Sequence, residues 1–413
     1  MESRNQEINN EFNNETVFFE EAEINSASFE IEGLEEESQD EMKTEKRAKL
    51  FNAPFIILVS LFVLSIIIYT VSRFVPAFAE IWTRYPAQLM RLVLAKLTGW
   101  IPFSFAETVI VTLPITVTAF LIGVSVSTKR NDSKENFYKW LRPIISVILV
   151  ILTLFFAAFG PAYGRYSLSQ NLKLDRKDVS VDELFATGII VSAFTNLDVG
   201  EIDFDSEGAS VMPYGFDVLV EKMNQAYRKY TDGLDYISHF DSSPKPIALS
   251  EPMTYTHISG VYTYMTGEAN ININYPDFLI PFTVAHEMAH QRGIAREDEA
   301  NFVAFLVCTY SDDAYIRYSG YANMLNYINS ALGKSDKEKG KELFQKYTPY
   351  NVQLEFAAYS EFFDKYREST ASKVSGTINN AYLQSQGQTA GTKSYGLVVD
   401  LAVAYYKRYT NAQ

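Results

Sequence analysis

Three stretches in the first 165 residues are apolar without interruption. Ala53–Val71 runs for about 19 residues without a charged side chain, close to the ~20 that a helix needs to cross a bilayer. Thr108–Ser127 and Pro143–Ala162 also lack charges and have similar lengths. The pattern therefore predicts a membrane region over residues 51–164, with three transmembrane helices at about 53–72, 108–127 and 143–162.

The distribution of basic residues predicts how these helices are oriented. A basic cluster precedes the first helix, and the turn between the second and third carries Lys129, Arg130, Lys134, Lys139 and Arg142. Positively charged loops tend to stay in the cytoplasm. We therefore expect a cytoplasmic N-terminus and an extracytoplasmic segment after residue 164. The inverted topology stays open, because long domains can cross a membrane regardless of charge.

Residues 1–50 have the composition of a disordered tail. Residues 1–40 carry 13 acidic side chains and the single Arg4, which is −12 of the chain's net charge of −14. Scattered apolar residues without a period cannot bury enough surface to offset the entropy of ordering. The rest of the chain is nearly neutral and has no basic stripe, so nucleic acid is not expected as a partner.

The loop between the first two predicted spans contains an amphipathic segment. Ala87–Leu97 spaces Leu89, Val93 and Leu97 at helical period around Arg91 and Lys96. Two interpretations stay open. The segment could lie on the membrane surface, or it could pack as a helix against the domain that follows.

Residues 165–413 have the composition of one globular domain. Tyr255–Tyr264 and Ala269–Asn274 alternate polar with β-branched or aromatic residues, which predicts a short antiparallel pair. The predicted fold class is mainly α, with three transmembrane helices followed by an α+β domain that contains a small sheet. The amphipathic runs predict helices at Tyr214–Tyr230, Pro281–Arg292, Glu297–Tyr310, Asp312–Leu332, Asp336–Tyr347, Val352–Glu368 and Gly396–Tyr406.

The sequence His286-Glu287-Met288-Ala289-His290 has the pattern H-E-x-x-H on a predicted helix. At i and i+4, the two imidazoles project from one face and can ligate one Zn²⁺. Glu287 points elsewhere, so it can act as general base and acid on a metal-activated water. The alternative is that two helical histidines simply pack. Gly293, which can end the helix and turn the chain back, favours the metal site.

A catalytic zinc site needs a third protein ligand. The next predicted helix begins with Glu297-Asp298-Glu299, and acidic residues in a first turn are also favoured by the helix dipole. Glu297 is the preferred ligand, because Asn301 follows it one turn later on the same face. Glu299 is the alternative.

The block His286–Ala304 resembles zincin metallopeptidases whose third ligand lies in an E-x-x-A-[DN] helix. The membrane-embedded prenyl-protein proteases, the HtpX-type proteases and the ImmA/IrrE-type peptidases share this pattern. The resemblance implies a zincin-like domain, with Glu297 in the ligand position and Asn301 in the Asp/Asn position that follows. Six residues separate His290 from Glu297, a shorter interval than in those proteases.

The layout more closely resembles a family of functionally uncharacterised bacterial membrane proteins with few spans. The shared segments are Gly260-Val261-Tyr262, Thr266-Gly267-Glu268-Ala269-Asn270-Ile271-Asn272 and the H-E-x-x-H block with Glu297-Asp298-Glu299-Ala300-Asn301-Phe302. This resemblance covers nearly the whole chain after the tail and implies no substrate.

Other residues are weaker candidates. Glu268 and Asn270 could line a cleft, although turn polarity explains them equally well. His257 and Tyr395 could polarise a tetrahedral oxyanion. His239 is interpreted as a surface or packing residue, and Cys308, in an apolar run, as a buried structural thiol.

The sequence thus favours a membrane-anchored zinc metallopeptidase that hydrolyses peptide or amide bonds on the extracytoplasmic side. Its expected partners are the lipid bilayer and a peptide or protein substrate. The alternative is a zinc-binding extracytoplasmic sensor or binding module without turnover. Glu287 argues against that alternative, since a structural zinc site would not need this carboxylate and would prefer four protein ligands.

Overall fold

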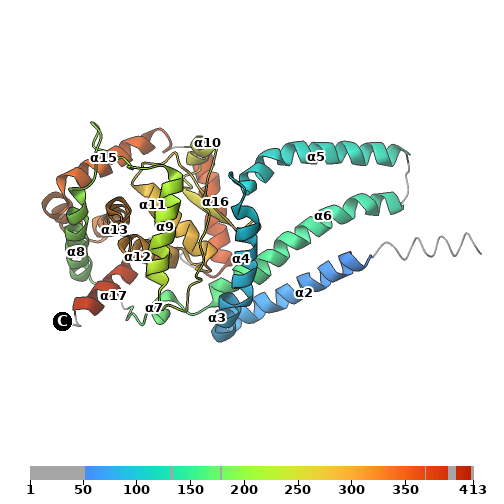
Figure 1. Cartoon of the computed structure of the whole chain (residues 1–413), viewed down its shortest axis with the longest axis horizontal. Coiled ribbons are helices and arrows are strands. Elements are labelled where there is room, and N and C mark those ends of the chain that lie inside the picture. The colour runs from blue at the N-terminus through green and yellow to red at the C-terminus, as the bar shows by residue number, and fades with distance from the viewer. Residues whose placement is uncertain (1–51, 131–133, 177–178, 368, 389–396, 411–413) are drawn as a thin grey trace, which may run out of the picture. The chain divides into compact units, whose positions relative to one another are not determined.

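The computed structural model describes residues 52–130, 134–176, 179–367, 369–388 and 397–410. The described chain is mostly helical, with one small sheet (Figure 1). The predicted tail, residues 1–50, lies outside the described residues. The helices are α2 (Ala53–Phe74), α3 (Pro76–Arg84), α4 (Pro86–Gly99), α5 (Phe105–Arg130), α6 (Lys134–Leu154), α7 (Leu168–Asn171), α8 (Val181–Val199), α9 (Phe216–Thr231), α10 (Ser250–Thr254), α11 (Leu279–Gln291), α12 (Glu297–Thr309), α13 (Ala314–Ser335), α14 (Lys337–Glu342), α15 (Tyr350–Asp364), α16 (Thr370–Ser385) and α17 (Val398–Thr410).

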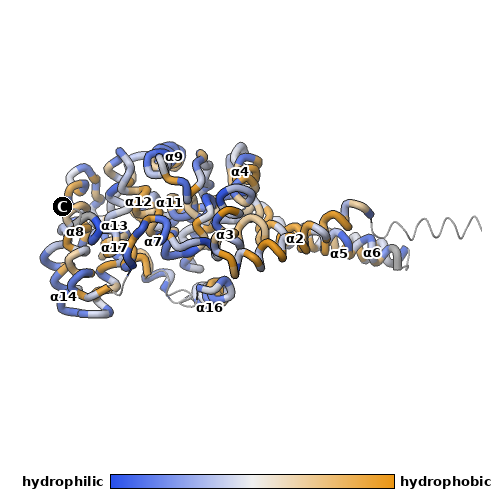
Figure 2. The backbone as a smooth tube through the Cα atoms, turned by 90° about the horizontal axis from the view of Figure 1, so that it is seen from below, coloured by the Kyte–Doolittle hydropathy of each residue, from blue (hydrophilic) through white to orange (hydrophobic). Residues whose placement is uncertain are grey.

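Among the described residues, three helices are long and apolar enough to cross a membrane: Ala53–Phe74, Phe105–Arg130 and Asn136–Gly164. Figure 2 shows hydrophobic residues along α2. These helices agree with the three predicted spans, and their length and composition fit membrane association. The described residues of 52–60 and 124–147 form one compact unit, and those of 61–123 and 148–410 form the other. The second unit contains the sheet and the H-E-x-x-H segment.

The third apolar helix ends inside the domain. After α6 the chain continues as a π-helical turn, η1 (Phe155–Phe159), and a 3-10 turn, η2 (Gly160–Gly164). Phe155, Phe159 and Tyr163 are buried and cluster with Tyr262. The last part of the stretch predicted to lie in the bilayer is therefore covered by protein.

Three central helices carry the main core. α11, α12 and α13 lie in the middle of the domain, with α8, α9, α15 and α17 around them (Figure 1). Phe302, Val303 and Leu325 are fully buried in this core. α11 and α12 are hydrophobic on most sides because they are enclosed on most sides.

Most predicted helices of the domain are present, with ends shifted by a few residues. Among the longer described helices of the domain, α8 and α16 were not predicted. In α8 the apolar and polar residues are spread around the helix without a periodic pattern, although Ser180 and Glu183 form a capping box at its start. α16 is rich in Ser, Thr and Asn, which are weak helix formers.

The sheet is small and mixed. β2 (Gly260–Thr263) pairs antiparallel with β3 (Glu268–Ile271), with Gly260 opposite Ile271 and Thr263 opposite Glu268. This confirms the predicted pair but shortens it, because His257 has a φ of 58° and the chain turns there. A two-residue strand, β1 (Lys245–Pro246), pairs parallel with β3 on its other side, so β2 is an edge strand.

Candidate metal centre

The end of α11 turns the chain back on itself. Gly293 has a φ of +90°, its N–H donates to the carbonyl of His290, and the N–H of Ile294 donates to the carbonyl of Ala289. These bonds form the Schellman motif that ends many helices. A residue with a side chain is strained at this φ, so glycine fits the position. The reversal brings the start of α12 back to the face of α11 that carries the histidines.

Three side chains converge at this reversal. The Glu297 Oε2 atom lies 3.3 Å from Nε2 of His286 and 3.5 Å from Nε2 of His290. One ligand atom from each residue lies within 4.8 Å of the others, so the group could hold a metal ion. Ligand atoms that share a tetrahedral zinc at roughly 2.0–2.1 Å are about 3.3 Å apart. The donor set and its spacing therefore fit zinc.

The histidines are oriented for ligation through Nε2. Nδ1 of His290 lies 2.7 Å from the carbonyl oxygen of Ile294, to which its N–H can donate. A hydrogen bond of this kind fixes the tautomer of a ligating histidine. Nδ1 of His286 is buried without a partner, as is the amide nitrogen of Asn301. The two rings are nearly perpendicular, at 89°, with centroids 4.6 Å apart.

The charges of His290 and Glu297 stabilise each other. Burial disfavours the charged form of His290, but the Glu297 carboxylate outweighs it and raises the pKa of His290 to about 9. Burial likewise opposes ionisation of Glu297, yet the two histidines hold its pKa well below the ordinary value. A metal ion that binds His290 must therefore displace a proton near neutral pH, which makes its affinity rise with pH.

Glu287 lies beside this group in a different environment. It is 4% exposed, and burial raises its pKa, although the neighbouring histidines oppose the shift. Its carboxylate accepts a hydrogen bond from the backbone of Tyr262 on β2. A Cβ at Gly260 would lie 2.7 Å from Cγ and Oε1 of Glu287, so the strand approaches this closely because residue 260 is glycine.

Aromatic residues from the third apolar helix reach the metal-ligand group. The ring of Phe159 meets that of His290 edge-on, with centroids 6.2 Å apart. The hydroxyl of Tyr163 donates to that of Tyr382 on α16 at 3.2 Å. Burial raises the pKa of Tyr382, with a smaller contribution from the charge of Glu297. The sequence interpretation singled out neither Phe159 nor Tyr382, because their approach depends on long-range packing.

Glu299 is engaged elsewhere. Its Oε1 accepts from the backbone N–H of Leu168 at 2.8 Å and from Arg296 at 3.0 Å. It faces α7, so Glu297 is the carboxylate that joins the histidines.

The remaining candidates do not join this group. His257 bonds the carbonyl of Tyr366 through Nε2 at 2.9 Å, and His239 is exposed. Cys308 is buried, and burial raises the pKa of its thiol. Tyr395 lies outside the described residues.

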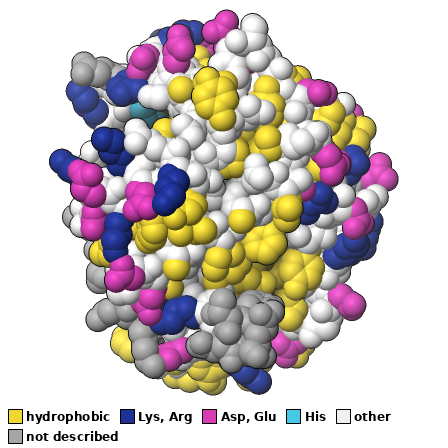
Figure 3. Space-filling model, turned by 90° about the vertical axis from the view of Figure 1, so that its left-hand side faces the viewer, with side chains coloured by type: hydrophobic (Ala, Val, Ile, Leu, Met, Phe, Trp, Pro, Cys, Tyr) yellow, Lys and Arg dark blue, Asp and Glu magenta, His cyan; other side chains and the backbone are white. Residues whose placement is uncertain are grey.

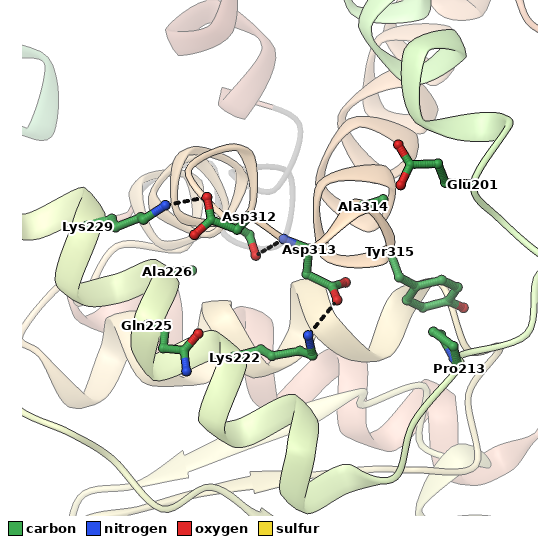
Figure 4. A pocket seen from close by; sticks show the side chains of 11 residues that line it. Glu201, Pro213, Lys222, Gln225, Ala226, Lys229, Asp312, Asp313, Ala314 and Tyr315 are labelled. Carbon is green, nitrogen blue, oxygen red and sulfur yellow. Dashed lines mark hydrogen bonds and ion pairs between the residues drawn. The ribbon is translucent and has the colours of Figure 1, made fainter.

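A separate depression lies between α9 and the start of α13 (Figure 4). Its volume is about 360 Å³. Lys222 pairs with Asp313 at 3.0 Å, and Lys229 pairs with Asp312. The depression contains none of the candidate site residues.

A family model described as "Protein of unknown function (DUF3810)" matches residues 83–403. The chain belongs to this family. No curated protein and no solved structure matches the sequence significantly. The DUF3810 region runs from the end of α3 into α17, so it includes two of the apolar helices and the whole metal-ligand group.

The Thr266–Asn272 segment of the DUF3810 protein has a structural role. Glu268 accepts hydrogen bonds from the backbone N–H groups of Phe105 and Ala106, both at 2.9 Å, and so caps α5. The Asn270 Oδ1 accepts from the hydroxyl of Ser104 at 2.7 Å. The sequence left open whether Glu268 and Asn270 line a cleft or are turn residues; in the structure, both fasten the start of the second apolar helix to the sheet.

Proposed function

We propose that the chain is a membrane-anchored zinc metallopeptidase that hydrolyses peptide or amide bonds. The observation that carries the proposal is the convergence of Glu297 Oε2 on Nε2 of both His286 and His290, at 3.3 and 3.5 Å. Two imidazoles and one carboxylate are a ligand set of catalytic zinc sites, which leave a fourth position open.

The chemistry divides between the metal and Glu287. A zinc ion held by His286, His290 and Glu297 would supply a water of lowered pKa and would polarise a substrate carbonyl. Glu287 follows His286 directly without being a ligand, and its buried side chain lies beside the two histidines. We assign it the transfer of the attacking water's proton to the departing amine.

The edge strand suggests how a substrate could bind. β2 has a neighbour on one side only, and Val261 on it is 44% exposed. The same strand contacts Glu287 through Gly260 and Tyr262. An extended peptide added to this edge would lie beside the metal ligands and bind mainly through its backbone.

Asn301 is proposed as a support for the ligands. It follows Glu297 by one turn on α12 and is buried, with an unpartnered amide nitrogen.

The test uses the whole chain in detergent, because α3, α4 and Phe155–Tyr163 belong to the packed domain. Zinc content and hydrolysis of casein and a peptide library would be measured for wild type, Glu287→Gln, His290→Ala and His239→Ala. His239 is an exposed histidine outside the metal-ligand group, so it is the matched control.

We expect stoichiometric zinc in wild type and in His239→Ala, and its loss in His290→Ala. Glu287→Gln should keep zinc and lose turnover by about 10²- to 10⁴-fold, the usual contribution of general acid–base catalysis. Zinc-free wild-type protein would refute the metal centre. Bound zinc without cleavage of any substrate would favour the sensor or binding module instead.

A further inference from the structure

The two helices that connect α2 to α5 have sharply different faces. Side chains on one face of α3 and α4 are buried against the domain: Ala79, Thr83, Ala87, Arg91 and Ala95 are between 0 and 8% exposed. The opposite face carries apolar residues that are at least 47% exposed and recur every three or four positions, as one helix face requires: Ile81, Tyr85, Leu89, Val93, Leu97 and, just beyond the helix, Trp100. We call these six residues the outer stripe.

The buried face fixes the orientation of the outer stripe. Arg91 is 1% exposed and donates to the carbonyls of Gln291, Ala158 and Thr83 at 3.2, 2.8 and 3.0 Å. A Cβ at Gly267 would lie 2.7 Å from the backbone nitrogen of Ala95, so the turn between β2 and β3 also fits closely against α4. Rotation of α4 would break these contacts, and the outer stripe therefore stays directed outward.

The composition of the outer stripe is unusual for a surface in water. Within α3 and α4, Lys96 is the single exposed residue that is not apolar. The face of the domain in Figure 3 instead mixes charged side chains with hydrophobic ones. Contiguous exposed apolar surface of this kind marks an interaction site.

The chain on both sides of the outer stripe identifies its partner. α2 and α5, which flank it, are two of the helices long and apolar enough to cross a membrane. Val75 alone separates α2 from α3, and five residues separate α4 from α5. Tyr85 and Trp100 are amphipathic aromatic residues, which gather at membrane interfaces. A surface tied this closely to two spans lies at the boundary of the bilayer.

We propose that the outer stripe rests in the headgroup region of the lipid bilayer. The bond from Arg91 to Gln291, the last residue of α11, then couples this membrane contact to the helix that carries His286 and His290. The bilayer sets the height of the metal-ligand group above its surface. The lipid contact itself does not depend on the proposed peptidase activity.

The test measures the depth of single fluorescent probes in the full chain. Leu89→Cys and Leu97→Cys would be labelled with nitrobenzoxadiazole and reconstituted in phosphatidylcholine–phosphatidylglycerol vesicles. Quenching by lipids with a nitroxide on the headgroup would be compared with quenching by lipids carrying it at acyl carbon 12. Leu197→Cys on α8, 72% exposed, is the control for water, and Ile115→Cys on α5, 70% exposed, is the control for the bilayer interior. Cys308 is buried, so wild type reports background labelling.

Both outer-stripe probes should emit at shorter wavelength than the Leu197 probe. Headgroup nitroxide should quench them at least about twofold more than the deep nitroxide, because interfacial helices sit roughly 5–10 Å into the boundary. The Ile115 probe should show the opposite preference. Outer-stripe probes that behave like Leu197, or like Ile115, would overturn the proposal. Short-wavelength emission without quenching by either lipid would also overturn it, since a protein partner or a second copy would then cover the outer stripe.

Discussion

At the scale of single residues, the proposed function depends on side chains that the sequence places apart. His286 and His290 were predictable because a helix fixes their separation, whichever fold surrounds it. The sequence favoured Glu297 without excluding Glu299, since both lie in the first turn of α12. The bonds of Glu299 to Leu168 and Arg296 decide between them.

Gly260 offers a test of the packing between β2 and Glu287. Gly260→Ala would place a Cβ 2.7 Å from the Glu287 side chain. Such overpacking typically costs about 1–3 kcal/mol, and displacement of Glu287 should lower turnover at least about tenfold while zinc stays bound. The control is Gly333→Ala, at a helical position where an added Cβ meets nothing within 4 Å. Thermal unfolding and casein hydrolysis of both variants provide the measurement. Equal behaviour of the two would mean that the strand is not held against Glu287.

At the scale of elements, the turn after α11 is decisive because it returns α12 to the histidines. Gly293→Ala should lose stability through its positive φ, about 1–2 kcal/mol, and should also lower zinc affinity by moving Glu297. An added Cβ there would lie 2.6 Å from the Arg91 guanidinium, so a further cost is expected.

Gly233→Ala is the matched control for this turn. Its φ is +72°, but an added Cβ would have open space. Gly233→Ala should lose a similar amount of stability, because alanine is strained at this φ, and should keep its zinc affinity. Thermal unfolding measures the stability, and competition with a chromogenic chelator measures the zinc affinity. If Gly293→Ala binds zinc as tightly as Gly233→Ala does, the turn after α11 does not control the metal centre.

The attachment of α3 to the domain should respond to acid. Glu80 accepts from Arg165 at 3.0 and 2.6 Å and from Arg84 at 2.7 Å. Burial opposes its ionisation, but the two guanidinium groups hold its pKa below the ordinary 4.5. A carboxyl with a lowered pKa in the folded state contributes stability above its unfolded pKa and loses it as the pH falls below about 4.5.

Glu80→Gln should therefore lower the free energy of unfolding at pH 7 by about 3–5 kcal/mol, because it leaves Arg165 buried without its charged partner. It should also lose less stability than wild type between pH 7 and pH 3, because the contribution of Glu80 is lost below about pH 4.5. Glu342→Gln, which removes an exposed pair with Lys346, should cost under about 0.5 kcal/mol. Thermal unfolding at both pH values gives the stability of all three proteins. If Glu80→Gln loses as much stability in acid as wild type, groups other than Glu80 cause the loss.

At the scale of the whole molecule, the three apolar helices allow two opposite orientations in the membrane. We propose that the metal-ligand group faces the extracytoplasmic side, because basic residues such as Lys129 and Arg130 fill the loop between the second and third apolar helices. A membrane-impermeant maleimide should label Leu197→Cys on intact cells. It should label Lys129→Cys only after permeabilisation, with wild type as the background control. The reverse pattern would establish the inverted topology.

The sequence alone determined the features that depend on neighbours along the chain. Uninterrupted apolar runs predicted the three membrane-length helices, and helical periodicity predicted most helices of the domain and the spacing of His286 and His290. Neither signal contains information on which distant segments touch. The tertiary structure alone directed Glu299 away from the histidines, tied Glu268 and Asn270 to α5, buried Phe155–Tyr163 and set α4 with Arg91 inward. Each of these outcomes depends on packing between segments remote in sequence, where burial and the satisfaction of polar groups outweigh local preference.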